Sequence, residues 1–147
     1  MKTFIFILIL LSFLQTTIIP LDLSLMVLLL RSYISSEKEN LFLGFGVGLM
    51  ISYLSNNPLG FHSLIFLMLI ELTQLFRKTP LAGHFLVIVP LMFTMLSLQS
   101  VVVLIFLQPS INWLQILIES LLALPLYLII KIWEERFVVR SEIKLRV

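Results

Sequence analysis

Long apolar segments separated by short polar breaks dominate this sequence and constrain its fold more than any other feature. Of the 147 residues, 60% are hydrophobic and 12% are charged, against ~45–50% apolar and ~25% charged in soluble proteins. The mean hydropathy is +1.12. We therefore expect an all-α integral membrane protein. No segment between the apolar runs is long enough for a separate soluble domain, so we expect a single domain over residues 1–147.

The breaks between apolar runs divide the chain into six predicted transmembrane helices. As one helix, residues 3–34 would be about 48 Å long against a hydrocarbon core of ~30 Å, so we divide them at Pro20, where a helix loses a backbone donor. Asp22 then begins the second helix, where its carboxylate would cap the positive end of the helix dipole. Pro90 is expected to be tolerated inside the fifth span. The predicted spans are residues 3–19, 22–35, 41–55, 60–76, 83–107 and 111–133, followed by a short cytoplasmic tail, 134–147.

The positions of the basic residues support this bundle. If both termini lie on one side of the membrane, every Lys and Arg falls on that side, and the loops near Pro20, Asn56 and Gln108 contain none. Under the positive-inside rule, that side is the cytoplasm. The same test says little about the division between the first two spans. If they were one helix, only Lys2 would change to the other side of the membrane. The net charge is only +2, and we expect no nucleic-acid binding.

Beyond the last span, residues 142–147 alternate charged and apolar side chains. This pattern is typical of a strand added to a partner's sheet edge, or of a segment lying on anionic lipid. A solvated, frayed terminus is the simpler interpretation.

A glycine-rich motif over residues 44–64, GFGVGLMISYLSNNPLGFHSL, is the most informative part of the chain. Gly44, Gly48 and Ser52 recur every four residues and so share one helix face. Small side chains on such a face let a neighbouring backbone approach closely. The spacing therefore predicts a packing face, with no chemistry of its own.

A predicted turn follows this face. Asn56 and Asn57 tolerate a left-handed backbone and Pro58 fixes φ. Gly60 removes the last Cβ before the chain returns to apolar surroundings. We therefore expect the third and fourth spans to form a close hairpin, with helix-packing or partner-binding residues Gly44, Gly48, Ser52, Pro58 and Gly60.

This motif resembles the signature of the MreD family, the integral membrane rod shape-determining proteins of bacteria. The resemblance rests on Gly44-Phe45, Gly48-Leu49 and Pro58-Leu59-Gly60-Phe61-His62-Ser63-Leu64, together with Leu14-Gln15-Thr16 and Pro20-Leu21-Asp22-Leu23. The predicted number of helices agrees with it. The chain departs from the family at Ser52, where an aspartate is usual, so no role of that acid is carried over.

The resemblance implies a non-catalytic scaffold of the cell-elongation machinery in the bacterial cytoplasmic (inner) membrane. Its implied partners are a single-pass MreC-like protein, the actin-like MreB, the glycosyltransferase and transpeptidase that build lateral peptidoglycan, and membrane lipids. It also implies a fold similar to that of the substrate-binding subunits of energy-coupling factor vitamin transporters, so a transporter subunit is the alternative. Those subunits typically carry Ala-x-x-x-Ala in their first span, and residues 3–19 contain no alanine.

Two carboxylates, Glu71 and Glu119, lie within predicted spans. An intramembrane carboxylate costs ~2.5–3.5 kcal/mol, so each needs a proton, a partner or an aqueous cavity, and we expect neither to face lipid. Helical spacing places each on one face with further, mostly polar, residues, and these form a seam inside the bundle or at an interface with another membrane protein. The seam consists of Ser63, Leu67, Glu71, Gln74 and Lys78 in the fourth span, Thr94 and Ser97 in the fifth, and Asn112, Gln115, Glu119, Ala123 and Tyr127 in the sixth.

The simpler role of this seam is interhelical hydrogen bonding or partner contact, and a small-molecule cavity or a proton-linked site is the alternative. His62 and His84 begin successive spans on opposite sides and cannot share a metal, so we interpret both as polar anchors. The chain has no cysteine, and it contains no nucleophile elbow or phosphate loop. We expect no enzymatic activity, no metal and no cofactor.

Overall fold

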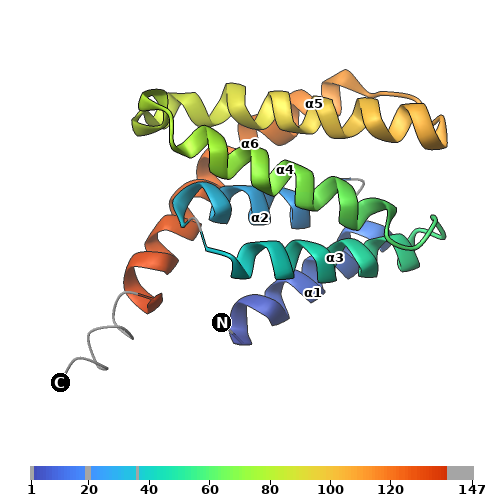
Figure 1. Cartoon of the computed structure of the whole chain (residues 1–147), viewed down its shortest axis with the longest axis horizontal. Helices are drawn as coiled ribbons and strands as arrows, with labels where there is room; N and C mark the ends of the chain where they lie inside the picture. The colour runs from blue at the N-terminus through green and yellow to red at the C-terminus, as the bar shows by residue number, and fades with distance from the viewer. Residues whose placement is uncertain (1, 19–20, 36, 139–147) are drawn as a thin grey trace.

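The computed structural model describes residues 2–18, 21–35 and 37–138, and every regular element within them is helical (Figure 1). Short 3-10 segments, η1 (Pro80–Gly83) and η2 (Phe85–Val87), precede the fifth α-helix, and a π-helical segment, η3 (Glu134–Val138), follows the sixth. The all-α prediction is confirmed for this part of the chain. The α-helices are α1 (Lys2–Thr17), α2 (Leu23–Ile34), α3 (Glu39–Leu54), α4 (Phe61–Arg77), α5 (Ile88–Leu107) and α6 (Trp113–Trp133).

The predicted segments correspond to these six helices, with one clear difference at the start of the fifth. The prediction of a helix from residue 83 is wrong, because Gly83 ends η1, His84 is extended between the two 3-10 segments, and α5 begins at Ile88 after η2. Pro90 therefore lies in the first turn of α5, where a backbone N–H has no acceptor in the helix. The predicted break at Pro20 and the alternating segment 142–147 lie outside the described residues.

Helix length separates the elements into two groups. Among the described residues, Phe85–Leu107 and Trp113–Arg136 are long and apolar enough to cross a membrane, by length and composition. The apolar helices α1, α2 and α3 are shorter, at 16, 12 and 16 residues. The shortest of these, α2, is also the most enclosed by the rest of the molecule.

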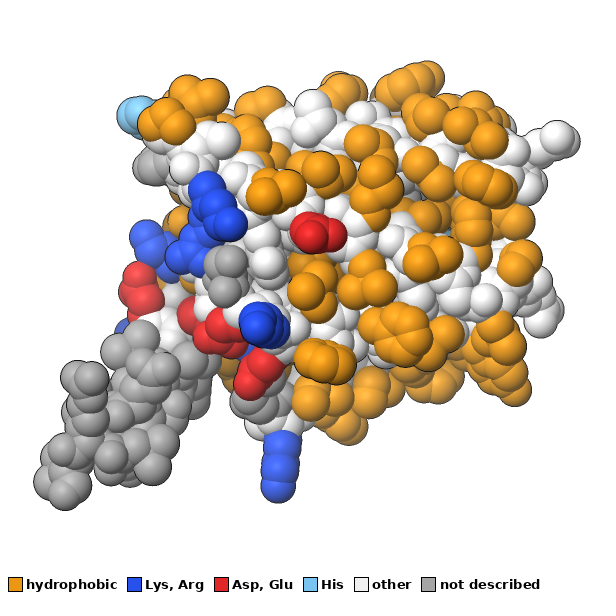
Figure 2. Space-filling model, in the orientation of Figure 1, with side chains coloured by type: hydrophobic (Ala, Val, Ile, Leu, Met, Phe, Trp, Pro, Cys, Tyr) orange, Lys and Arg blue, Asp and Glu red, His pale blue; other side chains and the backbone are white. Residues whose placement is uncertain are grey.

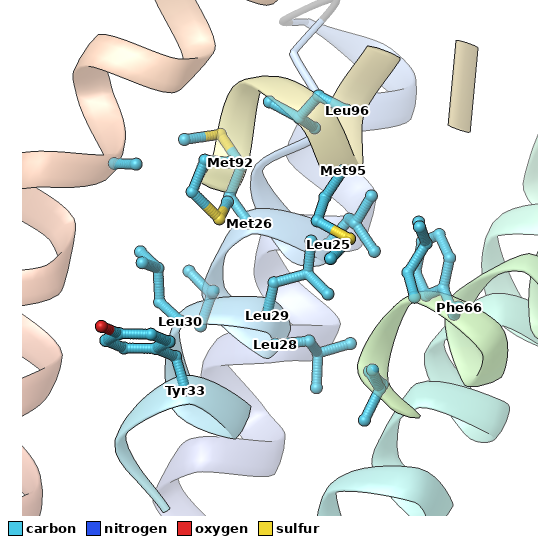
Figure 3. Packing of buried hydrophobic residues seen from close by; sticks show 14 of the residues in the cluster. Leu25, Met26, Leu28, Leu29, Leu30, Tyr33, Phe66, Met92, Met95 and Leu96 are labelled. Carbon is cyan, nitrogen blue, oxygen red and sulfur yellow. The ribbon is translucent and has the colours of Figure 1, made fainter. Parts of the chain in front are cut away.

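Helix α2 lies at the centre of the core. Residues 24–33 are all buried, as expected for a helix that is apolar on nearly every side. Figure 3 shows Leu25 and Leu29 of α2 beside side chains of α4 and α5, among them Phe66 and Met95. Helices α1, α3 and α6 also contact α2. The core is therefore built around a helix that presents no free face.

The glycine face of α3 packs directly on α4. A Cβ on Gly48 would lie 2.5 Å from the Ser63 Cα and 2.6 Å from the Ser63 nitrogen, so the two backbones touch at this point. A Cβ on Gly44 would lie 2.3 Å from the Cδ1 atom of Ile70. The Ser63 hydroxyl donates a hydrogen bond to the Phe45 carbonyl oxygen (3.0 Å). These contacts join α3 and α4 into a close hairpin.

The connection between α3 and α4 contains two left-handed residues, Asn56 (φ 53°) and Gly60 (φ 91°). Gly60 directly precedes α4. A Cβ on Gly60 would meet no atom within 4 Å, so the missing Cβ relieves no contact at this position. Its backbone conformation, which glycine adopts at little cost, explains this residue. Pro58 is exposed and its carbonyl accepts a hydrogen bond from the Phe61 N–H (3.1 Å).

The outer surface is mostly apolar, and the charges gather at one end. Figure 2 shows hydrophobic side chains over much of the face that it displays, with most Lys, Arg, Asp and Glu side chains on one side. At that end lie the α2–α3 and α4–α5 connections and the end of α6 (Figure 1). The α3–α4 and α5–α6 connections lie at the opposite end. The molecule therefore has one charged end, one uncharged end and an apolar circumference.

Candidate functional site

A buried polar network joins four helices near the uncharged end, and Asp22 is its first centre. The Asp22 carboxylate accepts a hydrogen bond from the Gln15 amide of α1 (2.6 Å) on Oδ1. On Oδ2 it accepts a second from the Gln99 amide of α5 (3.0 Å). Gln99 is only 5% exposed. Asp22 thus connects α1 and α5, although 77 residues separate it from Gln99.

Glu119 of α6 is the second centre of this network. Its Oε1 atom accepts a hydrogen bond from the backbone N–H of Asp22 (3.1 Å) and another from the Gln115 amide (2.9 Å). The side chain is 2% exposed. Because the donor is the backbone N–H of residue 22, this contact between the start of α2 and α6 does not use the Asp22 side chain.

Ser24 connects the network to α2. Its hydroxyl and its backbone N–H both donate to the Gln15 carbonyl oxygen, at 2.5 and 3.3 Å. The Gln15 amide therefore accepts from α2 on its oxygen and donates to Asp22 on its nitrogen. We define the polar network as Gln15, Asp22, Ser24, Gln99, Gln115 and Glu119.

The network corrects the predicted role of Asp22. This residue precedes α2, but its side chain makes no capping hydrogen bond to that helix. Both carboxylate oxygens instead accept from glutamine amides of other helices. Neutral amides and one backbone N–H surround the two carboxylates, and no ion pair within the described ranges includes either of them. The arrangement can clamp helices together and can hold a proton on a carboxylate oxygen.

The predicted seam is only partly present. In α6, Glu119 and Ala123 are buried and Gln115 belongs to the network. In α5, the hydroxyls of Thr94 and Ser97 donate to carbonyls of their own helix, and Gln99 reaches the network instead. The predicted seam did not include Gln15 and Gln99. Each is a glutamine inside an apolar run, and this was the sequence signal that could have identified them.

Glu71 does not join the network, and of the two places predicted for the seam, the inside of the bundle does not apply to this residue. The residue is exposed on α4, and Ser63, two turns earlier, is buried. Residues eight apart in a helix differ by about 80° in direction, since each step is 100°. The residues of the predicted face therefore do not share one environment, because Ser63 faces the bundle and Glu71 faces away from it.

Ser52 is buried on the glycine face and contacts His62 at the start of α4. The Ser52 hydroxyl oxygen accepts from the His62 backbone N–H (3.2 Å) and lies 3.3 Å from the His62 Nδ1 atom. His62 is 8% exposed and His84 is exposed, so His62 is more enclosed than the expected polar anchor. Within residues 2–18, 21–35 and 37–138, no group of three or more His, Cys, Asp or Glu could hold a metal ion.

A buried arginine, Arg31, connects several segments at the charged end. From the sequence it was considered only as one of the basic residues that indicate the membrane orientation. Arg31 is 2% exposed and forms ion pairs with Glu37 and Glu134, each at 3.7 Å. Its guanidinium also lies over the Phe4 ring, 4.5 Å from the centroid. Arg31 thereby links α1, α2, the α2–α3 connection and the segment after α6.

These sites connect helices at both ends of the molecule and along the glycine face. Comparison of the chain with models of protein families, with curated proteins and with solved structures found no match.

Proposed function

We propose that this chain is a non-catalytic subunit of the cell-elongation machinery, embedded in the bacterial cytoplasmic membrane by six helices, with both termini in the cytoplasm. Its role would be to bind other membrane proteins, among them an MreC-like single-pass protein, and so to support lateral peptidoglycan synthesis. The resemblance of residues 44–64 to MreD supplies the cellular process. The distribution of apolar and charged side chains supports the membrane location.

The observation that carries the proposal is the apolar circumference between a charged and an uncharged end. Large hydrophobic side chains on α1, α3, α4, α5 and α6 are exposed, including Phe6 (68%), Phe42 (80%), Leu64 (71%) and Phe106 (69%). An exposed apolar surface of this extent is typical of a chain surrounded by lipid or by partner proteins. A 12-residue α2 of about 18 Å fits the same arrangement, because surrounding helices cover it.

The internal contacts favour a scaffold over a transporter subunit. The polar network uses the carboxylates of Asp22 and Glu119 and the amide nitrogens of its glutamines to join α1, α2, α5 and α6. An arrangement of this kind stabilises the bundle and leaves the outer helix faces for partners.

Topology is tested by single cysteines in the cysteine-free chain. Asn57→Cys should react with a membrane-impermeant maleimide in intact cells, and Lys38→Cys should react only after permeabilisation. Gln108→Cys is the matched control for the uncharged end and should behave like Asn57→Cys. Labelling of Asn57→Cys that requires permeabilisation would contradict the proposed orientation.

Function is tested by co-purification in detergent with an MreC-like protein, and separately with the ATPase module of an energy-coupling factor transporter. We expect the MreC-like protein to co-purify without added ligand. Recovery of the ATPase module together with a tightly bound vitamin-like molecule would replace the scaffold proposal with the transporter alternative.

A further inference from the structure

An apolar groove lies on the outer surface between α4 and α5. Its volume is about 260 Å³, and its lining includes the rings of Phe61 and Phe106, whose centroids are 5.5 Å apart. Every side chain that lines the groove is apolar. The lining residues are Phe61, Leu64, Ile65, Met68, Leu98, Val102 and Phe106.

Glu71 extends this surface beyond the groove. It follows Met68 by three residues, so it lies about 4.5 Å further along the axis of α4 on nearly the same face. Leu64, Met68 and Leu75 on that face are 71%, 54% and 54% exposed, and Glu71 is exposed among them. Within the described parts of the chain, Glu71 forms no hydrogen bond or ion pair.

The position of the Glu71 carboxylate indicates which kind of molecule covers the groove. Glu71 is six residues before Arg77, about 9 Å along the helix axis from that end of α4. A lipid tail can fill an apolar groove, but it brings no hydrogen-bond donor or cation to the carboxylate. A second copy of the chain packed by the same face would bring a second Glu71, and like charges at that depth repel.

We propose that the groove and Glu71 together bind a transmembrane helix of a partner protein, one that carries a single Lys or Arg among apolar residues. Its apolar side chains lie against Leu64, Leu98 and Val102, and its cationic side chain pairs with Glu71. This inference rests on the proposed membrane location and names the docking face of the proposed scaffold. Apolar packing holds the helix, and the ion pair fixes its depth and selects it from other apolar helices.

The test measures binding of synthetic transmembrane peptides to the whole chain in bilayer nanodiscs. Three peptides share a Leu/Ala sequence and differ at one position, which is Lys, Leu or Glu. Energy transfer from a labelled peptide to an acceptor on Asn57→Cys reports binding. We expect the Lys peptide to bind about tenfold more tightly than the Leu peptide, and the Glu peptide to bind most weakly.

Two variants assign the preference to Glu71. Because Glu71 has no hydrogen-bond or ion-pair partner among the described residues, Glu71→Gln should keep the fold, which gel filtration checks, and should remove most of the preference for the Lys peptide. In the double variant Glu71→Gln/Leu121→Glu, the carboxylate moves to α6, where Leu121 is 52% exposed. The preference should not return, because that face lacks the groove.

Separate outcomes test the groove and the alternatives. Val102→Trp should fill the groove and weaken the binding of both the Lys and the Leu peptide. A Lys preference that survives Glu71→Gln, or that Leu121→Glu restores, would overturn the proposal. Energy transfer between two labelled copies of the chain that Glu71→Gln abolishes would replace the partner helix with a second copy.

The controls separate this inference from the proposed function. Equal binding of the three peptides to a chain that has the proposed topology would reject the docking site alone. A chain that does not insert into nanodiscs would reject the membrane location on which both proposals depend.

Discussion

Substitution of Gly48 by alanine tests the backbone contact between α3 and α4. The added Cβ would lie 2.5 Å from the Ser63 Cα and 2.9 Å from the His62 carbonyl carbon. These atoms belong to the backbone of α4, so no rotation of a side chain relieves the clash. The two helices must separate by about 0.9 Å at this point to reach the 3.4 Å of an ordinary contact.

The cost of that separation follows from the neighbouring contacts. Overpacking of a tight core costs ~1–3 kcal/mol. A shift of this size would also stretch the 3.0 Å bond from the Ser63 hydroxyl to the Phe45 carbonyl beyond hydrogen-bond range, which costs ~0.6 kcal/mol for an average bond in a membrane protein. Replacing glycine by alanine within a helix stabilises the helix by ~1 kcal/mol, which offsets part of this cost. We therefore expect Gly48→Ala to lower the free energy of unfolding by a net ~0.6–2.6 kcal/mol.

Two glycines of the same helix provide matched controls. A Cβ on Gly46 meets nothing within 4 Å, so Gly46→Ala should leave stability unchanged or raise it by up to ~1 kcal/mol. A Cβ on Gly44 meets the flexible Cδ1 atom of Ile70 at 2.3 Å, so Gly44→Ala should lie between the other two. The expected order of stability is Gly46→Ala, then Gly44→Ala, then Gly48→Ala.

The assay is reversible unfolding of the purified chain in mixed micelles, where the SDS fraction is raised and far-ultraviolet circular dichroism follows the helix content. The three variants and the unmodified chain are compared at the same protein and detergent concentrations. Equal stability of Gly48→Ala and Gly46→Ala would refute the argument that the α4 backbone occupies the space beside Gly48.

Three further predictions use the same unfolding assay. Glu119→Leu removes the acceptor for the Asp22 backbone N–H and should cost ~1–3 kcal/mol, whereas Glu119→Gln keeps an oxygen there and should cost less. Arg31→Met leaves a buried carboxylate unpaired and should cost ~3–5 kcal/mol, whereas Glu37→Gln should cost under ~1 kcal/mol because the Glu37 side chain is 40% exposed. Gly60→Ala places a Cβ on a residue with φ 91° and should cost ~1–2 kcal/mol. An unchanged free energy of unfolding for Glu119→Leu, Arg31→Met or Gly60→Ala would contradict the contact or backbone conformation assigned to that residue.

The helices could be predicted closely because apolar runs and their interruptions are local properties of the chain. The one clear error, the start of the fifth helix, has a local cause as well. Residues 85–87 are apolar enough to continue a helix, but they form a 3-10 turn before α5 begins at Ile88. Hydropathy does not distinguish a 3-10 turn from the first turn of an α-helix.

The glycine face was predictable from spacing, and the polar network was not. Four-residue spacing places Gly44 and Gly48 on one side of α3 without any knowledge of the neighbour. By contrast, the carboxylate of Asp22 meets the amides of Gln15 and Gln99, which belong to helices that sequence cannot place beside each other. The same limit explains Glu71, since periodicity gives its face on α4 but not which side of α4 the bundle covers.

The sequence by itself determined the helical class, the approximate helix bounds, the hairpin between α3 and α4, and the side of the chain that carries the basic residues. Only the tertiary structure decided that α2 is enclosed, that Asp22 and Glu119 share a network, and that Glu71 stands outside. The physical reason is that backbone hydrogen bonds and side-chain periodicity act within about one helical turn. The pairing of helix faces depends instead on packing between residues that lie tens of positions apart.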